Sequence, residues 1–191
     1  MNKQRKEDRR NAYTKGVIRD AVFQLLQTKP IDKITVSEVC KIADINRSTF
    51  YLHYMDCHHV LEQEQERFCD KLIDYMEEHK NENPLDIILE MHKIIRDDSD
   101  LYLLLIRSDQ PMHSFKKFTD YCKQFLIAKL TEKTSLTVEE ADWIAHYIIG
   151  GSFANTTRFA HELDDNLHRE EIIHNFVING LNGFVSRKEH L

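Results

Sequence analysis

The residues best placed for chemistry lie in one segment, positions 35 to 54, TVSEVCKIADINRSTFYLHY. Near its end Phe50 and Tyr54 stand four residues apart, which in a helix puts both rings on one inward face. The neighbouring positions then point outward and carry hydrogen-bond donors and aromatic tips. Such groups reach the phosphate oxygens and base edges of nucleic acid. The outward residues are Arg47, Thr49, Tyr51 and His53.

Two short helices are needed to position these side chains. Thr35 and Glu38 have the spacing of a capping box that starts the first helix. Asp44 and Ile45 supply a tight turn, and the side-chain oxygen of Asn46 is expected to cap the second helix. The first turn of that helix has unpaired N–H groups and the positive end of the helix dipole, which suits a phosphate-lined groove. The pattern predicts a helix-turn-helix, whereas the plain alternative is an ordinary pair of core helices.

The stretch ITVSEVCKIADINRSTFYLHY, followed by MDCHHVLEQE, resembles the DNA-binding segment of the TetR family of bacterial transcription regulators. The match spans about residues 10 to 65. Asp44 stands where that family usually has glycine, and aspartate tolerates the left-handed turn. Cys57 replaces a lysine that commonly contacts phosphate, which leaves His58 or His59 as substitutes. The resemblance and the outward pattern give one DNA-binding set: Thr35, Ser37, Asn46, Arg47, Ser48, Thr49, Tyr51, His53 and His58.

Composition predicts an all-α protein. The 191-residue chain is 41% hydrophobic but has only 5 Gly and 3 Pro, which leaves little room for sheet turns. Periodicity predicts a three-helix head in residues 1–56, joined by a long helix to a C-terminal helical dimerisation and ligand domain, 57–191. Ile31 and Ile34 form a connector in the head, and Thr137 and Glu140 form a second capping box. The expected helices cover about residues 11 or 14 to 28, 57–79, 85–96, 100–107, 111–130, 138–161 and 167–185.

Charge is segregated along the chain. Residues 1–60 hold 11 Lys+Arg against 7 Asp+Glu, a net +4, and the rest holds 15 against 25, a net −10. This asymmetry would keep the acidic part away from DNA phosphates. The basic N-terminus is either a solubilising tail or an arm that follows the DNA backbone or enters the minor groove. Its basic residues are Lys3, Arg5, Lys6, Arg9 and Arg10.

Other classes of protein lack support in the sequence. There is no signal peptide, and the longest apolar runs cannot cross a bilayer, so we expect a soluble cytoplasmic protein without a membrane partner. The 4 cysteines lack CxxC spacing and the 11 histidines lack HxxxH spacing, which predicts neither a metal site nor a cofactor. No nucleophile and base pair indicates an enzyme.

The last two helices are predicted to form a dimer interface. Gly150 and Gly151 inside a helix cost about 1 kcal/mol each relative to alanine, and close approach of another helix would compensate. The resemblance implies a homodimer held by a four-helix bundle built from these helices. The alternative is one kinked helix in a monomer. The expected interface residues are Gly151, Phe153, Phe176 and Gly180.

Several aromatic residues could line an apolar effector pocket, although this spacing is also that of plain core. The leading function is a regulator, a repressor as is usual in the family, that binds a palindromic double-stranded operator as a homodimer and is released by a small molecule. The alternative is a TetR-like co-regulator that acts through a protein partner without its own inducer. The sequence does not identify the operator, the genes, the effector or the sign of regulation. The pocket candidates are Tyr102, Phe118, Tyr121, Cys122, Trp143 and Tyr147.

Overall fold

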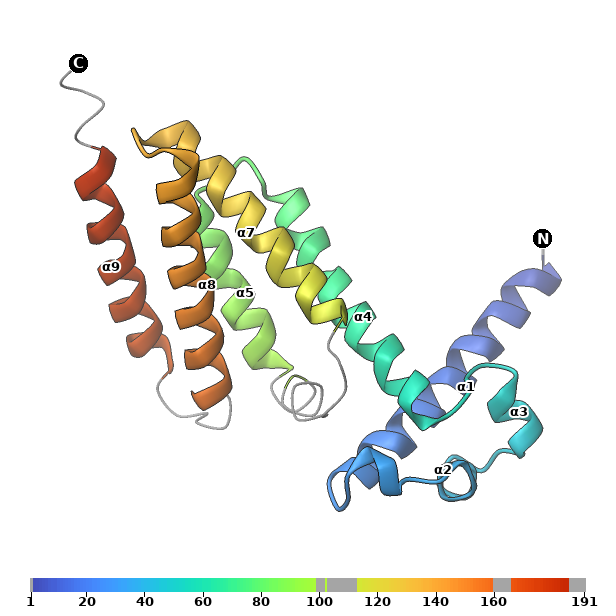
Figure 1. Ribbon diagram of the computed structural model, residues 1–191. Helices are drawn as coiled ribbons and strands as arrows, with labels where there is room; N and C mark the ends of the chain where they lie inside the picture. The colour runs from blue at the N-terminus through green and yellow to red at the C-terminus, as the bar shows by residue number, and fades with distance from the viewer. Residues whose placement is uncertain (1, 99–101, 103–112, 160–165, 186–191) are drawn as a thin grey trace. The chain divides into compact units, whose positions relative to one another are not determined.

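The computed structural model describes residues 2–98, 102, 113–159 and 166–185, and every regular element within them is a helix (Figure 1). This confirms the predicted all-α class. The helix expected at 100–107 lies outside the described residues except for Tyr102, which is helical. The elements are α1 Asn2–Leu26, η1 Ile31–Lys33, α2 Val36–Ile42, α3 Arg47–Tyr51, α4 Cys57–Glu78, α5 Pro84–Asp97, α7 His113–Lys133, α8 Val138–Phe159 and α9 Asn166–Val185.

The described chain divides into two compact units, and the division falls inside α4, between Arg67 and Phe68. The first unit contains α1, η1, α2, α3 and the first half of α4. The second contains the rest of α4 and the helices that follow it. The predicted boundary between a DNA-binding domain and a regulatory domain, at residues 56 and 57, concerns function and stays a prediction.

The first unit is built on α1. Its core contains four fully buried residues, Ile18, Val22, Val39 and Phe50. The connector residues Ile31 and Ile34 are buried as well, as predicted. However, α1 begins at Asn2, well before the predicted start at residue 11 or 14. Residues 9–13 are exposed, so they carry no apolar period, and the pattern could detect only the part of α1 that packs on a core.

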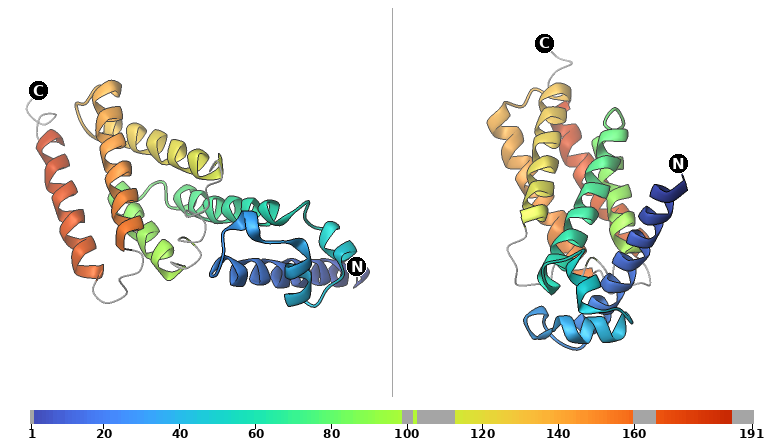
Figure 2. Two further views of the ribbon diagram at one scale, coloured as in Figure 1. Left: turned by 60° about the horizontal axis from the view of Figure 1, so that its bottom comes forward. Right: turned by 90° about the vertical axis from the view of Figure 1, so that its right-hand side faces the viewer.

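The second unit is a helical bundle in which α8 and α9 run antiparallel side by side (Figures 1 and 2). Leu126 of α7 and Ala145 and Ile148 of α8 form the centre of its core. Residues from α5 and α9 pack against this centre, including Ile88 and Val177. The buried sides of α5, α7, α8 and α9 therefore pack against one another. The residues on the other sides of these helices are left to form the surface of the unit.

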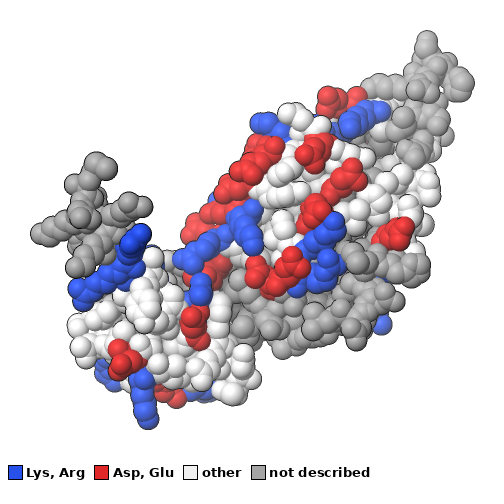
Figure 3. Space-filling model, turned by 180° about the vertical axis from the view of Figure 1, so that it is seen from behind, with Lys and Arg blue, Asp and Glu red and all other residues white. Residues whose placement is uncertain are grey.

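One face of the second unit carries interspersed acidic and basic side chains (Figure 3). Lys117 Nζ lies 3.1 Å from Asp70 Oδ1 and ties α7 to α4. Lys123 Nζ lies 2.7 Å from Asp142 Oδ1 and ties α7 to α8. Exposed pairs of this kind contribute about 0–1 kcal/mol each, so the fold depends on the apolar core beneath them.

Candidate DNA-binding and dimerisation surfaces

The helix-turn-helix begins with the predicted capping box. Thr35 N donates to Glu38 Oε2 at 3.0 Å, and Glu38 N donates to Thr35 Oγ1 at 3.4 Å. Lys29 Nζ, from the connection after α1, also donates to Glu38 Oε1 at 2.6 Å. The hydrogen bonds from Lys29 and then Thr35 lower the pKa of the Glu38 carboxyl to about 2. Glu38 therefore stays ionised and fixes the start of α2 to the end of α1.

The turn between α2 and α3 depends on Asp44. Its φ of 51° lies in the left-handed region, where most residues with a Cβ are strained. Ile45 N closes the turn by donating to Cys40 O at 3.0 Å. The prediction that an aspartate can take the place of glycine here is confirmed.

The predicted cap of α3 is wrong in one respect. Asn46 has the extended backbone of an N-cap residue, with φ −78° and ψ 152°, but its side chain makes no capping hydrogen bond. Its carbonyl oxygen still accepts from Phe50 N at 3.1 Å. Because Asn46 is exposed, water can solvate the first N–H groups of α3 at little cost, which removes the need for a side-chain cap.

The two faces of α3 are separated as the spacing predicts. Phe50 is fully buried and Tyr54 is 1% exposed, whereas Tyr51 is 58% exposed. Arg47 Nη2 donates to Ser37 Oγ, so an exposed donor of α3 is joined to the outer side of α2. Apart from His58, which lies at the start of α4, the remaining members of the expected set lie on the same two helices and their connections. Thr35, Asn46 and Ser48 are exposed, and Thr49 and His53 are half-buried.

Tyr54 holds the corner between α3 and α4. Its ring centre lies 6.0 Å from that of Phe50 and 5.8 Å from that of His59. From α1, Lys15 Nζ lies 5.8 Å from the same ring centre and 3.5 Å from Gln63 Oε1 of α4. Burial raises the pKa of the Tyr54 hydroxyl, so it stays neutral and the corner is held mainly by packing.

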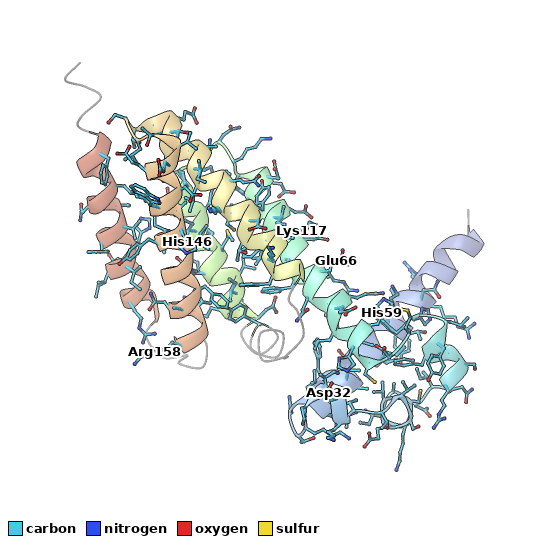
Figure 4. All side chains as sticks on the ribbon, in the orientation of Figure 1. Asp32, His59, Glu66, Lys117, His146 and Arg158 are labelled. Atoms are coloured by element: carbon cyan, nitrogen blue, oxygen red, sulfur yellow. The ribbon has the colours of Figure 1, made fainter. Side chains whose placement is uncertain are left out.

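The three residues that open α4 are engaged within the first unit. Cys57 is 3% exposed, and burial raises the pKa of its thiol to about 11, so it presents no charge to a phosphate. His58 Nε2 lies 3.1 Å from Asp32 Oδ1. His59, at the start of α4 in Figure 4, accepts from Met55 N through Nδ1 at 3.0 Å. A phosphate contact by His58 would therefore require release from Asp32.

Two exposed apolar residues that the sequence pattern did not single out lie beside this surface along the chain. Leu52 is 80% exposed and Met55 is 71% exposed, and they flank the outward Tyr51 and His53 along the chain. Neither follows the inward spacing of α3, and that mismatch is the signal that could have identified them. Apolar tips in this position suit the methyl group of thymine.

A second surface runs along α8 and α9. Besides Val138 at the start of α8, four large apolar side chains are more than half exposed there, from 55% to 71%. Gly151 of α8 and Gly180 of α9 have no neighbouring atom within 4 Å of a Cβ built on them, so no described helix of the same chain approaches them closely. His146 and Arg158 mark the course of α8 in Figure 4. The four apolar residues are Trp143, Tyr147, Ile172 and Phe176.

The six residues expected to line one pocket lie in different environments. Tyr102, Phe118 and Cys122 are buried in the core, where the Cys122 thiol lies 3.6 Å from Met76 Sδ. Tyr121 donates its hydroxyl to Glu77 of α4. Trp143 and Tyr147 are 63% and 71% exposed on the outer side of α8, so they line no interior space with the others. The reason is helical phase, since Ala141, Ala145 and Ile148 occupy the inner side.

Phe153 is intermediate between the two environments. It is 37% exposed, and its ring centre lies 4.8 Å from that of Phe115 on α7. One edge of this expected interface residue is thus packed within its own chain.

His92 on α5 is a further polar group in the second unit. Burial, and secondly the charge of Arg96 one turn away, lower the pKa of its imidazole to about 4. The ring is therefore neutral near pH 7 and can both donate and accept a hydrogen bond. Sequence spacing drew attention to His92 only as one of many scattered histidines, because burial is not visible in spacing.

The described part of the chain lacks two other kinds of site. These residues contain no group of three or more His, Cys, Asp or Glu side chains placed to hold a metal ion. None of the described helices combines the length and the apolar character needed to span a membrane.

A family model for the TetR-type "transcriptional regulator C-terminal region" matches residues 82–178, just over half of the chain. The protein belongs to the TetR family of transcriptional regulators. The match lies in the C-terminal part, so it is independent of the helix-turn-helix residues. No curated protein matches the chain.

Solved structures of TetR-type regulators share the fold. The fatty acid degradation regulator FadR from Bacillus halodurans has a TM-score of 0.70 at 18% identity, covering 88% of this chain and 96% of its own. A TetR transcriptional regulator from Streptococcus agalactiae 2603V has a TM-score of 0.65 at 22% identity, covering 92% and 97%. The dihydroxyacetone kinase operon activator DhaS has a TM-score of 0.61 at 20% identity, covering 90% and 97%. At these identities the likeness concerns fold alone.

Proposed function

We propose that this TetR-family regulator is a cytoplasmic repressor that binds a palindromic operator as a homodimer and is released by a small molecule. It acts by binding rather than by catalysis. The observation that carries the proposal is the exposed surface of α2 and α3, where Arg47 and Tyr51 project outward while Phe50 anchors the helix in the core. This arrangement presents donors to DNA from a rigid support.

The DNA contacts divide into two kinds. Arg47 and Thr49 at the start of α3 select bases, since an arginine can bind guanine O6 and N7 together. Tyr51 and His53, at the end of α3 and after it, position the first unit on phosphates. Thr35, Ser37, Asn46 and Ser48 border this surface and complete the backbone contacts.

The homodimer forms through the exposed face of α8 and α9. Trp143, Tyr147 and Phe176 would be costly to leave in water together, because large contiguous apolar patches are uncommon on monomers. Gly151 and Gly180 leave room for a second copy to approach the helix backbones closely. Two-fold symmetry places two identical reading surfaces on the DNA, so the half-sites are inverted repeats about one helical turn, or a small multiple of it, apart.

The effector binds in the second unit, and α4 carries its effect to the DNA-binding residues. His92 of α5 supplies a half-buried imidazole that is neutral near pH 7 and can donate and accept a hydrogen bond. Effector and operator are coupled reciprocally. A molecule that weakens DNA binding tenfold, about 1.4 kcal/mol, must itself bind the DNA complex tenfold more weakly.

The decisive experiment selects bound fragments from random double-stranded DNA with the purified protein. The expected result is one enriched inverted repeat whose affinity falls when either half-site is scrambled. Enrichment of no sequence above background, or of a single unrepeated site, would overturn the operator proposal. Sedimentation of the same sample gives the oligomeric state independently.

One observation favours the co-regulator alternative. Tyr102, Phe118 and Cys122 fill core positions instead of lining space, and burial leaves each less than 10% exposed. A protein partner would then replace the small molecule. Screening a metabolite library for loss of operator binding distinguishes the two, because a co-regulator would respond to none of the compounds. The sign of regulation follows from reporter expression with and without the gene, and the likeness to an operon activator makes that measurement worthwhile.

A further inference from the structure

Leu52, the residue that ends α3, is the most exposed large apolar side chain in the described part of the chain, at 80%. Single exposed apolar residues are common on protein surfaces, so exposure alone indicates no function. The position of Leu52 around the helix is what sets it apart, because it decides which molecule this side chain can meet.

Helical phase places Leu52 on the outermost line of α3. Leu52 keeps the right-handed helical backbone, with φ −69° and ψ −22°, and its N–H donates to Ser48 O at 3.2 Å. At about 100° per residue, Ser48 and Leu52 both lie about 160° around the helix from the buried Phe50. Arg47 and Thr49 lie nearer the sides, at about 60° and about 100° from Phe50. A groove that receives the outer side of α3 therefore meets Leu52 directly.

The backbone that carries Leu52 is fixed on both sides. Phe50 O accepts from Tyr54 N at 3.0 Å, and the two buried rings, with centres 6.0 Å apart, anchor this turn in the core. After the turn, Met55 N donates to His59 Nδ1 at 3.0 Å, which ties the chain to α4. Because the support is rigid, a contact made by Leu52 costs little ordering of the backbone.

A leucine side chain can recognise only one kind of group on the base edges of the major groove. This groove is about 12 Å wide and admits an α-helix, so outward side chains can reach the base edges. All four bases present hydrogen-bonding groups there, and thymine alone adds a methyl group, on C5. Leucine makes no side-chain hydrogen bond, so packing it on a polar edge would remove water without replacing the lost hydrogen bond. Thymine is therefore the base that suits this position.

The neighbours of Leu52 on α3 favour DNA over a protein partner. The exposed residues of this helix, Arg47, Ser48 and Tyr51, all carry hydrogen-bond donors. A protein interface has an apolar centre inside a polar rim, whereas a single apolar group among donors suits a surface that binds phosphates and reads bases. We propose that Leu52 is a specificity-determining residue that selects thymine, through its C5 methyl group, at one position of each operator half-site. This inference rests on the proposed operator binding.

The test replaces thymine by uracil, one position at a time in both half-sites, in the inverted repeat that selection enriches. Uracil lacks only the methyl group, so base pairing is kept. At one position the wild-type affinity should fall about fourfold per half-site, the worth of burying one methyl group, or about 0.8 kcal/mol. Leu52→Ala should bind the thymine operator more weakly and should not distinguish thymine from uracil there. Leu52→Met keeps an apolar side chain and should retain part of the distinction.

Ile42→Ala is the matched control, because it shortens an exposed aliphatic side chain at the end of α2. Its ratio of thymine to uracil affinity should equal that of the wild type. Two results would overturn the inference while leaving operator binding intact: a wild type that responds to uracil at no position, or a Leu52→Ala variant that keeps the wild-type ratio. If the wild type enriches no sequence at all, the proposed function and the inference fail together. Circular dichroism of the variants checks that the fold is kept.

Discussion

Acidification should destabilise the protein through His92, and the expected size follows from its burial. The pKa of this imidazole is about 4 in the folded protein, against 6.5 for the unperturbed side chain. The unfolded chain therefore takes up a proton near pH 6.5, whereas the folded chain resists it until about pH 4. The free energy of unfolding falls throughout that window, by about 1.4 kcal/mol per pH unit. The full loss is about 3 kcal/mol, a large share of a typical domain stability of about 5–15 kcal/mol.

Urea unfolding of the wild type and of His92→Gln, at about pH 7 and about pH 4.5, measures this effect. Other titrating groups act equally in both proteins, so their contributions cancel in the comparison. The wild type should lose about 2–3 kcal/mol more than the variant between the two pH values. His92→Leu should behave like His92→Gln, which separates the proton effect from the loss of a polar group. Protein concentration must be fixed because a dimer unfolds in a concentration-dependent way. Parallel losses in all three proteins would refute the assignment of a buried neutral imidazole.

Three further outcomes follow from the two surfaces and the cap. Phe176→Glu should give monomers with weak operator binding. In the wild type, the fluorescence of Trp143 should shift to the blue as protein concentration rises, because dimerisation buries the indole, and the variant should lose this shift. A variant that remains dimeric in sedimentation would contradict the proposed interface. Arg47→Ala should lower the free energy of operator binding by about 1–3 kcal/mol and relax the preference at one base position. Tyr51→Phe should instead lower the affinity for all DNA sequences alike. An unchanged sequence preference of Arg47→Ala in binding selections would exclude base readout by Arg47. Thr35→Ala should lower the free energy of unfolding by about 1 kcal/mol by removing the α2 cap, and an unchanged urea midpoint would show that Lys29 and Glu38 suffice.

The local architecture of the helix-turn-helix could be predicted from the sequence. A capping box, a left-handed turn residue and a pair of inward rings are each defined by residues within four positions of one another. Thr35 with Glu38, Asp44, and Phe50 with Tyr54 therefore determine their conformation with little help from the rest of the chain. The bounds of α9, Asn166–Val185, likewise agree with the predicted helix at 167–185.

The effector residues could not be grouped correctly from spacing alone. Trp143 and Tyr147 have the same periodicity as a buried stripe, but Ala145 and Ile148 occupy the inner side of α8. Two stripes on one helix are equivalent in sequence, and only the neighbouring helices decide which stripe is covered. The large aromatic residues are consequently on the exposed side of α8.

Long-range contacts also decided the state of the residues that open α4 and of His92 on α5. The sequence by itself determined that a cysteine replaces a lysine at position 57 and that histidines follow it. The tertiary structure decided that Cys57 is buried, that His58 faces Asp32, and that His92 is held neutral. A local pattern such as a capping box depends on the geometry of one helix turn, so the sequence by itself determines it. Burial and the charge state of a side chain depend on residues far apart in the chain, so only the tertiary structure decides them.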